Sequence, residues 1–416
     1  MKYLLQNLRS TLPSRFSTIY YMSCFLSFST IVISPQLIIA IIKLLGATSS
    51  IVGLYTSVQG ISGQLALFAA PACLHFFKNE KKMIIFFSGL SLAGFFLVPV
   101  SIICFVPGIA IILLITALSI HSFGAQNIAF PLNNIIRKSF NPDDRARVIG
   151  NASAISCLAL GAAGLIIKKI LEKDLSFPKD HSVIMIIGAF IYTLYMLNFL
   201  FIKNDSDQIH SIKKESWGKT LLKSFSSIAS VAKDRNILHL FMGIVFLSFS
   251  TSSMQLLLSV GFDLDHEVMT DNIALGIPLA MFLKFIFYYI FGRLASRKGN
   301  KFVLLIISSL GIFAPLTALF LPVEYYLAVI ISHNLLMMWY PFSLNEMFDH
   351  CSNENYSGYF VLFSLLSLPG SLAAPLLGLL ADKSLPVFSI ILILFIFIGL
   401  LFISSKYKSN TASVKI

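Results

Sequence analysis

The sequence predicts an all-α membrane protein with twelve transmembrane helices. Of its 416 residues, 56% are hydrophobic and only 12% are charged, whereas a soluble protein has about 25% charged residues. The apolar residues fall in runs of about 20, the length with which a helix crosses the hydrocarbon of a bilayer. No soluble fold covers so much apolar surface with so little charge, so the chain is expected to cross a membrane many times.

Twelve apolar runs are expected to be the spans. Several are longer than a crossing requires, which is typical of tilted helices that project from the bilayer. The expected spans cover residues 16–42, 50–77, 83–104, 107–136, 148–167, 182–202, 237–261, 272–291, 302–321, 325–348, 356–381 and 385–404.

The basic residues indicate how these spans are oriented. Lys and Arg total 31, and 24 of them fall in the two terminal segments and in the loops after even-numbered spans. Basic loops stay on the cytoplasmic side, so both termini are expected in the cytoplasm, at the inner membrane in a Gram-negative cell. The net charge of +12 is therefore assigned to the membrane face and not to nucleic-acid binding.

A long polar segment divides the spans six and six. It covers residues 204–235, between an N-terminal bundle at 1–203 and a C-terminal bundle at 236–416. Its central part, residues 217–231, is interpreted either as an amphipathic helix on the cytoplasmic leaflet or as a solvated linker. The sequence FLSFST at residues 25–30 recurs at 246–251, an offset of 221 residues. This repeat predicts two pseudo-symmetric six-helix bundles.

Three segments resemble a known family. Residues 292–301 have the pattern Gly-x-Leu-Ala-x-Arg-x-Gly-x-Lys, which is similar to a loop motif of the major facilitator superfamily. Residues 141–150 and 375–382 resemble the family's connection between spans 4 and 5 and the end of its span 11. The resemblance implies a transporter whose substrate binds near mid-membrane between two bundles.

The segment at 292–301 is expected to be a short loop that turns the chain back at the cytoplasmic face, with a gating role implied by the family. Gly292 and Gly299 allow a tight reversal, and Arg293, Arg297 and Lys301 hold it in the cytoplasm. The family usually has an acidic residue in place of Ser296, so no charge relay is expected in this loop.

Lys284 is the sharpest candidate for a substrate contact. It lies near the middle of span 8, where an ammonium is costly unless it faces a cavity or a partner, and no Asp or Glu lies mid-span to pair with it. It is interpreted as a contact for an anionic group, the alternative being a neutral or carbonyl-bonded lysine. Tyr288 shares its helical face, and Gln64 is its approximate equivalent in span 2.

Other polar side chains inside the spans complete the candidate site. Gln126, Gln255 and Asn334 are predicted to orient the substrate, since an amide in hydrocarbon needs a partner. His121 and His333 lie on spans 4 and 10 and are candidates for proton coupling, because histidine changes charge near neutral pH. A hydrogen-bonded packing role is the alternative for each histidine.

The sequence therefore predicts a secondary transporter, a symporter or uniporter, for a small, polar, anionic metabolite. No ATP-binding, catalytic or metal-ligand pattern occurs, so neither an enzyme nor a cofactor is expected. The expected partners are the small-molecule substrate, protons if transport is coupled, and the lipid bilayer, with the chain a monomer. The alternatives are efflux of an amphipathic drug or siderophore and a transporter-like sensor without flux. Drug efflux is disfavoured because residues 161–164 lack the proline of the antiporter motif that drug exporters of the resembled family carry in span 5.

Overall fold

A computed structural model describes residues 26, 29, 31–77, 79–139, 142–171, 177–198, 235–349 and 356–405. Within these ranges, eleven helical segments are long and apolar enough to cross a membrane. The first span is seen in its second half, as the 3-10 helix η1 (Ile31–Ile33) and the helix α3 (Pro35–Leu44). Residues 204–234 of the predicted polar segment lie outside the described residues. The division of the chain into two bundles at this segment stays a prediction.

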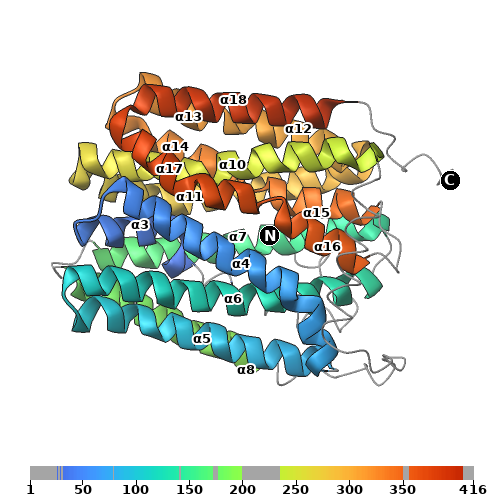
Figure 1. Cartoon of the computed structure of the whole chain (residues 1–416), viewed down its shortest axis with the longest axis horizontal. Helices are drawn as coiled ribbons and strands as arrows, with labels where there is room; N and C mark the ends of the chain where they lie inside the picture. Colours follow the sequence, from blue (N-terminus) through green and yellow to red (C-terminus); the bar gives the residue numbers. More distant parts are fainter. Residues whose placement is uncertain are drawn as a thin grey trace, which may run out of the picture.

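The long helices lie side by side in two groups, blue to green for the first half of the chain and yellow to red for the second (Figure 1). This arrangement confirms the predicted fold class. The first half consists of η1, α3, α4 (Ser49–Phe77), α5 (Glu80–Cys104), α6 (Pro107–Ser139), α7 (Pro142–Leu171) and α8 (Lys179–Asn198). The second half consists of α10 (Arg235–Leu264), α11 (His266–Lys298), α12 (Asn300–Gly311), α13 (Phe313–Phe320), η4 (Val323–Tyr325), α14 (Tyr326–Leu336), α15 (Trp339–Asp349), α16 (Tyr356–Leu365), α17 (Leu368–Lys383) and α18 (Leu385–Ser404).

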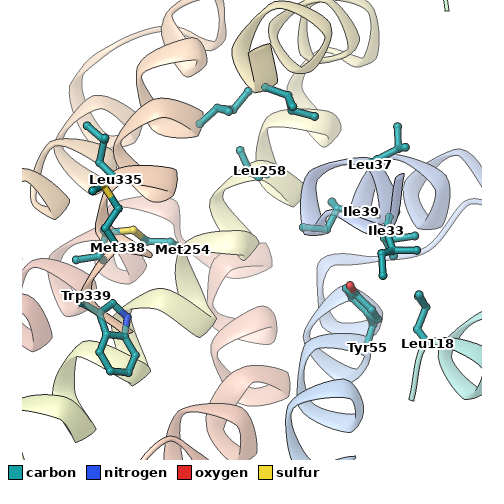
Figure 2. Close-up of a cluster of buried hydrophobic side chains, with 14 of the residues drawn as sticks. Ile33, Leu37, Ile39, Tyr55, Leu118, Met254, Leu258, Leu335, Met338 and Trp339 are labelled. Carbon is teal, nitrogen blue, oxygen red and sulfur yellow. The ribbon is translucent and has the colours of Figure 1, made fainter. Parts of the chain in front are cut away.

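Each half packs apolar side chains of its own. In Figure 2, Tyr55 and Leu118 of the first half lie on one side, and Met254 and Met338 of the second half lie on the other. All four side chains are fully buried. Many large apolar side chains on the outside are instead exposed, as a surface that faces lipid requires and as a soluble protein avoids. They include Ile112, Phe190 and Leu376.

The two halves meet mainly along two pairs of helices, α4 with α17 and α7 with α11. The first pair approaches backbone to backbone. A Cβ atom on Gly53 would lie 2.6 Å from the carbonyl oxygen of Ala374, and one on Gly378 would lie 2.7 Å from that of Ser49. Only glycine permits helices to come this close.

Three spans of the second half are broken within the membrane, although the sequence suggested single runs. The breaks separate α12 from α13, α14 from α15, and α16 from α17. A proline follows the end of each first segment by four or five residues: Pro315, Pro341 and Pro369. Proline has no N–H and clashes with the carbonyl four residues earlier, which ends the helix there.

The segment at 292–301 is a helix end and not the loop that the sequence suggested. Helix α11 continues through Gly292 to Lys298, and α12 begins at Asn300. Only Gly299 is left for the turn, with a φ of 86°, in the left-handed region that glycine tolerates. The prediction was wrong because leucine, alanine, arginine and lysine are good helix formers. Helix α11 therefore extends beyond the end of the apolar run.

The basic side chains of this segment contact nearby groups. The Arg293 guanidinium lies 4.2 Å from the centre of the Tyr289 ring. Arg297 is exposed in the last turn of α11, where the helix dipole favours a positive charge. Lys301 belongs to α12 and donates a hydrogen bond of 2.6 Å to the carbonyl of Ser405. The gating role of these residues stays a prediction.

Candidate functional site

A cavity of about 250 Å³ lies between the two halves. The start of α3 and helix α7 line it from the first half, and α11 and α14 line it from the second. Pockets for drug-sized ligands measure about 300–1,000 Å³, so this one fits a smaller metabolite. Its polar lining residues are Ser34, Gln36, Lys284, His333 and Asn334.

Lys284 reaches the cavity from the middle of α11. Within the described residues no hydrogen bond or ion pair holds its ammonium, and none of those that line the cavity is acidic. The charge lies close enough to Cys157 and His333 to interact with both electrostatically. A lysine at mid-bilayer costs about 3 kcal/mol on insertion scales. A polar cavity lowers that cost, because water or a ligand can solvate the ammonium there.

Helix α14 brings two neighbouring polar residues to the same cavity. His333 is only 1% exposed, and its Nδ1 atom has no hydrogen-bond partner in the described part of the chain. Asn334 donates from Nδ2 to the carbonyl of Ile330 at 2.9 Å, which leaves its side-chain oxygen for the cavity. Buried polar groups normally have partners, so the free imidazole nitrogen indicates a place for a ligand or water.

Gln36 also lines the cavity and was not predicted from the sequence. Its side chain is 4% exposed and lines the cavity, and its amide has no partner among the residues that the structure describes. Ser34, two residues earlier, does not cap α3, and its Oγ atom is buried without a partner there. The available signal was an amide inside an apolar run directly after a Ser-Pro pair, because such an amide needs a partner in hydrocarbon.

Two predicted substrate contacts do not line the cavity. Tyr288 is one helical turn beyond Lys284, and its ring stacks on Phe342 with centroids 6.2 Å apart. Gln126 of α6 packs against Gly63 of α4, whose added Cβ would lie 3.2 Å from Gln126 Cγ. Neither side chain is therefore among the residues that line the cavity with Lys284, and substrate contact by them stays a prediction.

Gln64 and Gln255 bridge the two halves and do not line the cavity. The Nε2 atom of Gln64 donates to Ser367 Oγ, which links α4 to the break before α17. The Oε1 atom of Gln255 accepts a hydrogen bond of 3.4 Å from Thr56 Oγ1, which links α10 to α4. In this structure both amides therefore hold the bundles together, and substrate binding by them stays a prediction.

His121 lies inside the first half, away from the cavity. Its Nδ1 atom is 2.9 Å from Ser91 Oγ, to which Tyr192 donates a hydrogen bond of 2.8 Å. The Phe95 ring meets the imidazole edge-on. This is the environment of a hydrogen-bonded packing residue, the alternative that the sequence left open for His121.

Polar contacts close one end of the junction between the halves. Lys43 Nζ lies 2.6 Å from both carboxylate oxygens of Asp263. Ser49 donates to the same carboxylate at 3.2 Å, and Ser259 donates to Ser49 at 2.9 Å. These contacts join the end of α3 and the start of α4 to the end of α10.

Beyond the cavity, toward the opposite ends of the helices, the two halves also meet through aromatic rings. Phe130 of α6 contacts Phe360 of α16, with ring centroids 5.2 Å apart and nearly perpendicular planes. The cavity therefore lies between a polar closure at one end and an apolar contact toward the other.

Comparison with known proteins decides the family. Residues 19–354 match the sequence profile of the Major Facilitator Superfamily. The chain belongs to the major facilitator superfamily. It is thus a multi-pass membrane transporter of that family. No curated protein is similar enough in sequence to match it.

Solved structures of major facilitator transporters share this fold. FucP in its outward conformation superposes with a TM-score of 0.61 at 16% identity, over 92% of this chain and 97% of FucP. A bacterial homologue of the iron transporter ferroportin, in an outward-facing state, gives 0.67 at 12%, over 94% and 98% of the two chains. The nucleoside transporter NupG gives 0.65 at 12%, over 95% and 100%. Identities this low show the fold alone.

Proposed function

We propose that this major facilitator transporter carries a small, polar, anionic metabolite across the inner membrane by alternating access. The observation that supports the proposal is the ammonium of Lys284, which lines the cavity between the halves where the described lining has no acidic side chain. An anionic cargo supplies the missing counter-charge. The similar structures are named for fucose, iron and nucleosides, so the anionic class is argued from this chain's own cavity.

His333 is the proposed site of proton coupling. It shares the cavity with Lys284, and a proton on its ring would repel the lysine ammonium at short range. An anion bound between them removes that repulsion, so the anion and the proton favour each other's binding. Symport of an anion with a proton follows from this arrangement, and uniport is the alternative if the proton proves dispensable.

The orientation of the transporter is proposed from its basic loops, with both termini in the cytoplasm and the chain working as a monomer. In this orientation the ion pair between Lys43 and Asp263 lies at the extracytoplasmic end. The pair must break for the cavity to open to that side, and it must form again for the cavity to open to the cytoplasm.

Uptake into proteoliposomes tests the proposal. We expect saturable uptake of one or more small organic anions from a panel of metabolites. Lys284→Ala should lower uptake at least about tenfold by removing the counter-charge, and Lys284→Arg should keep most of it. Lys383→Ala serves as the control, because Lys383 is exposed at the end of α17 and its loss should leave uptake unchanged.

Three results would point to other functions. Uptake of a neutral solute that survives Lys284→Ala would contradict the anionic cargo. Lower accumulation of an amphipathic drug in intact cells that express the protein would indicate efflux. Solute binding to the purified protein without flux would indicate a sensor.

A further inference from the structure

We infer that the start of α3 is the second half of the anion site, opposite Lys284, and that the group bound there is a singly charged carboxylate. The inference rests on the proposed function, because it takes the cavity to be the transport site. It adds a residue set from the first half of the chain and narrows the class of cargo.

The start of α3 is a helix N-terminus at the cavity. Residues 33–36 all line the cavity. The first N–H groups of a helix have no partner inside it. Pro35 has no N–H, and the N–H of Ile38 bonds to the carbonyl of Ser34 at 3.0 Å. The N–H groups of Gln36 and Leu37 remain, and Ser34 does not cap them.

Two buried side chains point independently to a ligand at this place. Gln36 and His333 are 4% and 1% exposed, both line the cavity, and neither has a hydrogen-bond partner for its side chain among the described residues. They come from opposite halves of the protein. Buried amides and imidazoles are rarely left without a hydrogen-bond partner. A polar ligand between Gln36 and His333 supplies that partner to both side chains.

The charges around the cavity fit one negative charge. With His333 neutral, Lys284 is the cationic side chain among the described residues that line the cavity, and a helix N-terminus adds the equivalent of about half a positive charge. This positive charge balances one carboxylate. A phosphate monoester carries close to two negative charges, and with His333 neutral the excess would be buried without a partner, which is costly. Gln36, His333 and Asn334 then form hydrogen bonds with the hydroxyl or amino groups of the cargo.

Substitution of Ser34 gives a direct test. Asp is a good N-cap residue, so Ser34→Asp should leave the melting temperature of the unliganded protein unchanged or raise it. Its carboxylate would nevertheless occupy the anion position and neutralise Lys284. Ser34→Asn has the same shape and also caps well, but it carries no charge. The two variants therefore differ only in the feature under test.

The full-length protein is purified, and the affinities of lactate, glycerate, glycerol 3-phosphate and glycerol are measured by thermal shift. We expect lactate or glycerate to raise the melting temperature of the wild type by mass action. Ser34→Asp should weaken this binding at least about tenfold, and Ser34→Asn should change it by less than about threefold. If Ser34→Asp does not fold, Gln36→Glu with Gln36→Met as its control poses the same question.

The outcomes separate the inference from the function on which it rests. Equal carboxylate binding by Ser34→Asp and Ser34→Asn, with loss only in Lys284→Ala, would overturn the role of α3 and leave an anion transporter. Binding of glycerol 3-phosphate in place of both carboxylates would overturn the carboxylate class alone. Binding of glycerol with none of the three anions would overturn both the inference and the proposed anionic cargo.

Discussion

The ammonium of Lys43 touches both carboxylate oxygens of Asp263 at 2.6 Å, across 220 residues of chain. This separation is close to the 221-residue offset of the repeated hexapeptide. The two residues therefore occupy nearly equivalent positions, at the ends of spans 1 and 7. The pair joins the halves where the two repeats face each other, with a basic residue in one copy and an acidic residue in the other.

Loss of Asp263 should destabilise the protein more than loss of Lys43. The Lys43 side chain is 2% exposed and that of Asp263 is 50% exposed. Asp263→Ala leaves a buried ammonium with the carbonyl of Ala47, 3.2 Å away, as its remaining hydrogen-bond partner among the described residues. We expect the free energy of unfolding to fall by about 1–3 kcal/mol, measured by thermal unfolding in detergent.

The exchanged double variant Lys43→Asp/Asp263→Lys is the control for the ion pair. It should recover part of the lost stability, because the attraction is restored with the opposite polarity. The pair would have no structural role if Asp263→Ala melted at the wild-type temperature.

Gly53→Val should block the close approach of α4 to α17. Its Cβ atom would lie 2.6 Å from the carbonyl oxygen of Ala374, a backbone atom that cannot move aside alone. We expect a lower melting temperature and an uptake rate reduced at least about tenfold, because packing this tight does not accept an extra group. Gly89→Ala is the matched control. Nothing lies within 4 Å of its added Cβ, so uptake should be unchanged and α5 should gain up to about 1 kcal/mol.

His121→Ala should lower stability without altering the pH dependence of uptake. The substitution removes the ring that Ser91 and Phe95 surround, at an expected cost of about 2 kcal/mol. Tyr192→Phe deletes only the hydrogen bond to Ser91 Oγ and should cost about 1 kcal/mol. A flattened pH profile in His121→Ala would show that this histidine takes part in coupling after all.

His333→Gln should change the pH dependence and leave substrate binding in place. If a proton on the imidazole accompanies the anion, uptake by the wild type falls as pH rises over the range in which the loaded imidazole gives up its proton. Glutamine keeps a hydrogen-bonding group in the cavity and cannot titrate, so the profile should become flat. Initial rates of uptake across this range are the measurement, and an unchanged slope in the variant would exclude His333 as the coupling site.

The spans and the polar surroundings of Lys284 could be predicted from the sequence for one physical reason. Hydrocarbon selects apolar runs of fixed length and makes a lone ammonium so costly that it must face a polar space. Lys284, His333 and Asn334 lie around one cavity in keeping with that cost. Their contact with substrate stays a prediction.

The other polar residues show where sequence reasoning ends. Whether Gln64 or Gln255 faces the cavity or the opposite bundle depends on the rotation of each helix, and the partners that set it, Ser367 and Thr56, are remote in the chain. Gln36 escaped notice because the break before α3 exposes it to the cavity, and helical periodicity assumes an unbroken helix.

The three breaks of the second half make the two bundles mechanically unequal. The helices α4, α5 and α6 continue through their internal prolines, so we expect these three helices to turn as a stiff block, while the first bundle has its own break before α3. The second bundle has three helix breaks within its spans, and Met337, at the break between α14 and α15, lines the cavity. We expect a cargo that shifts Met337 to tilt α15 about this break, so that a small displacement at the cavity becomes a larger one at the other end of α15.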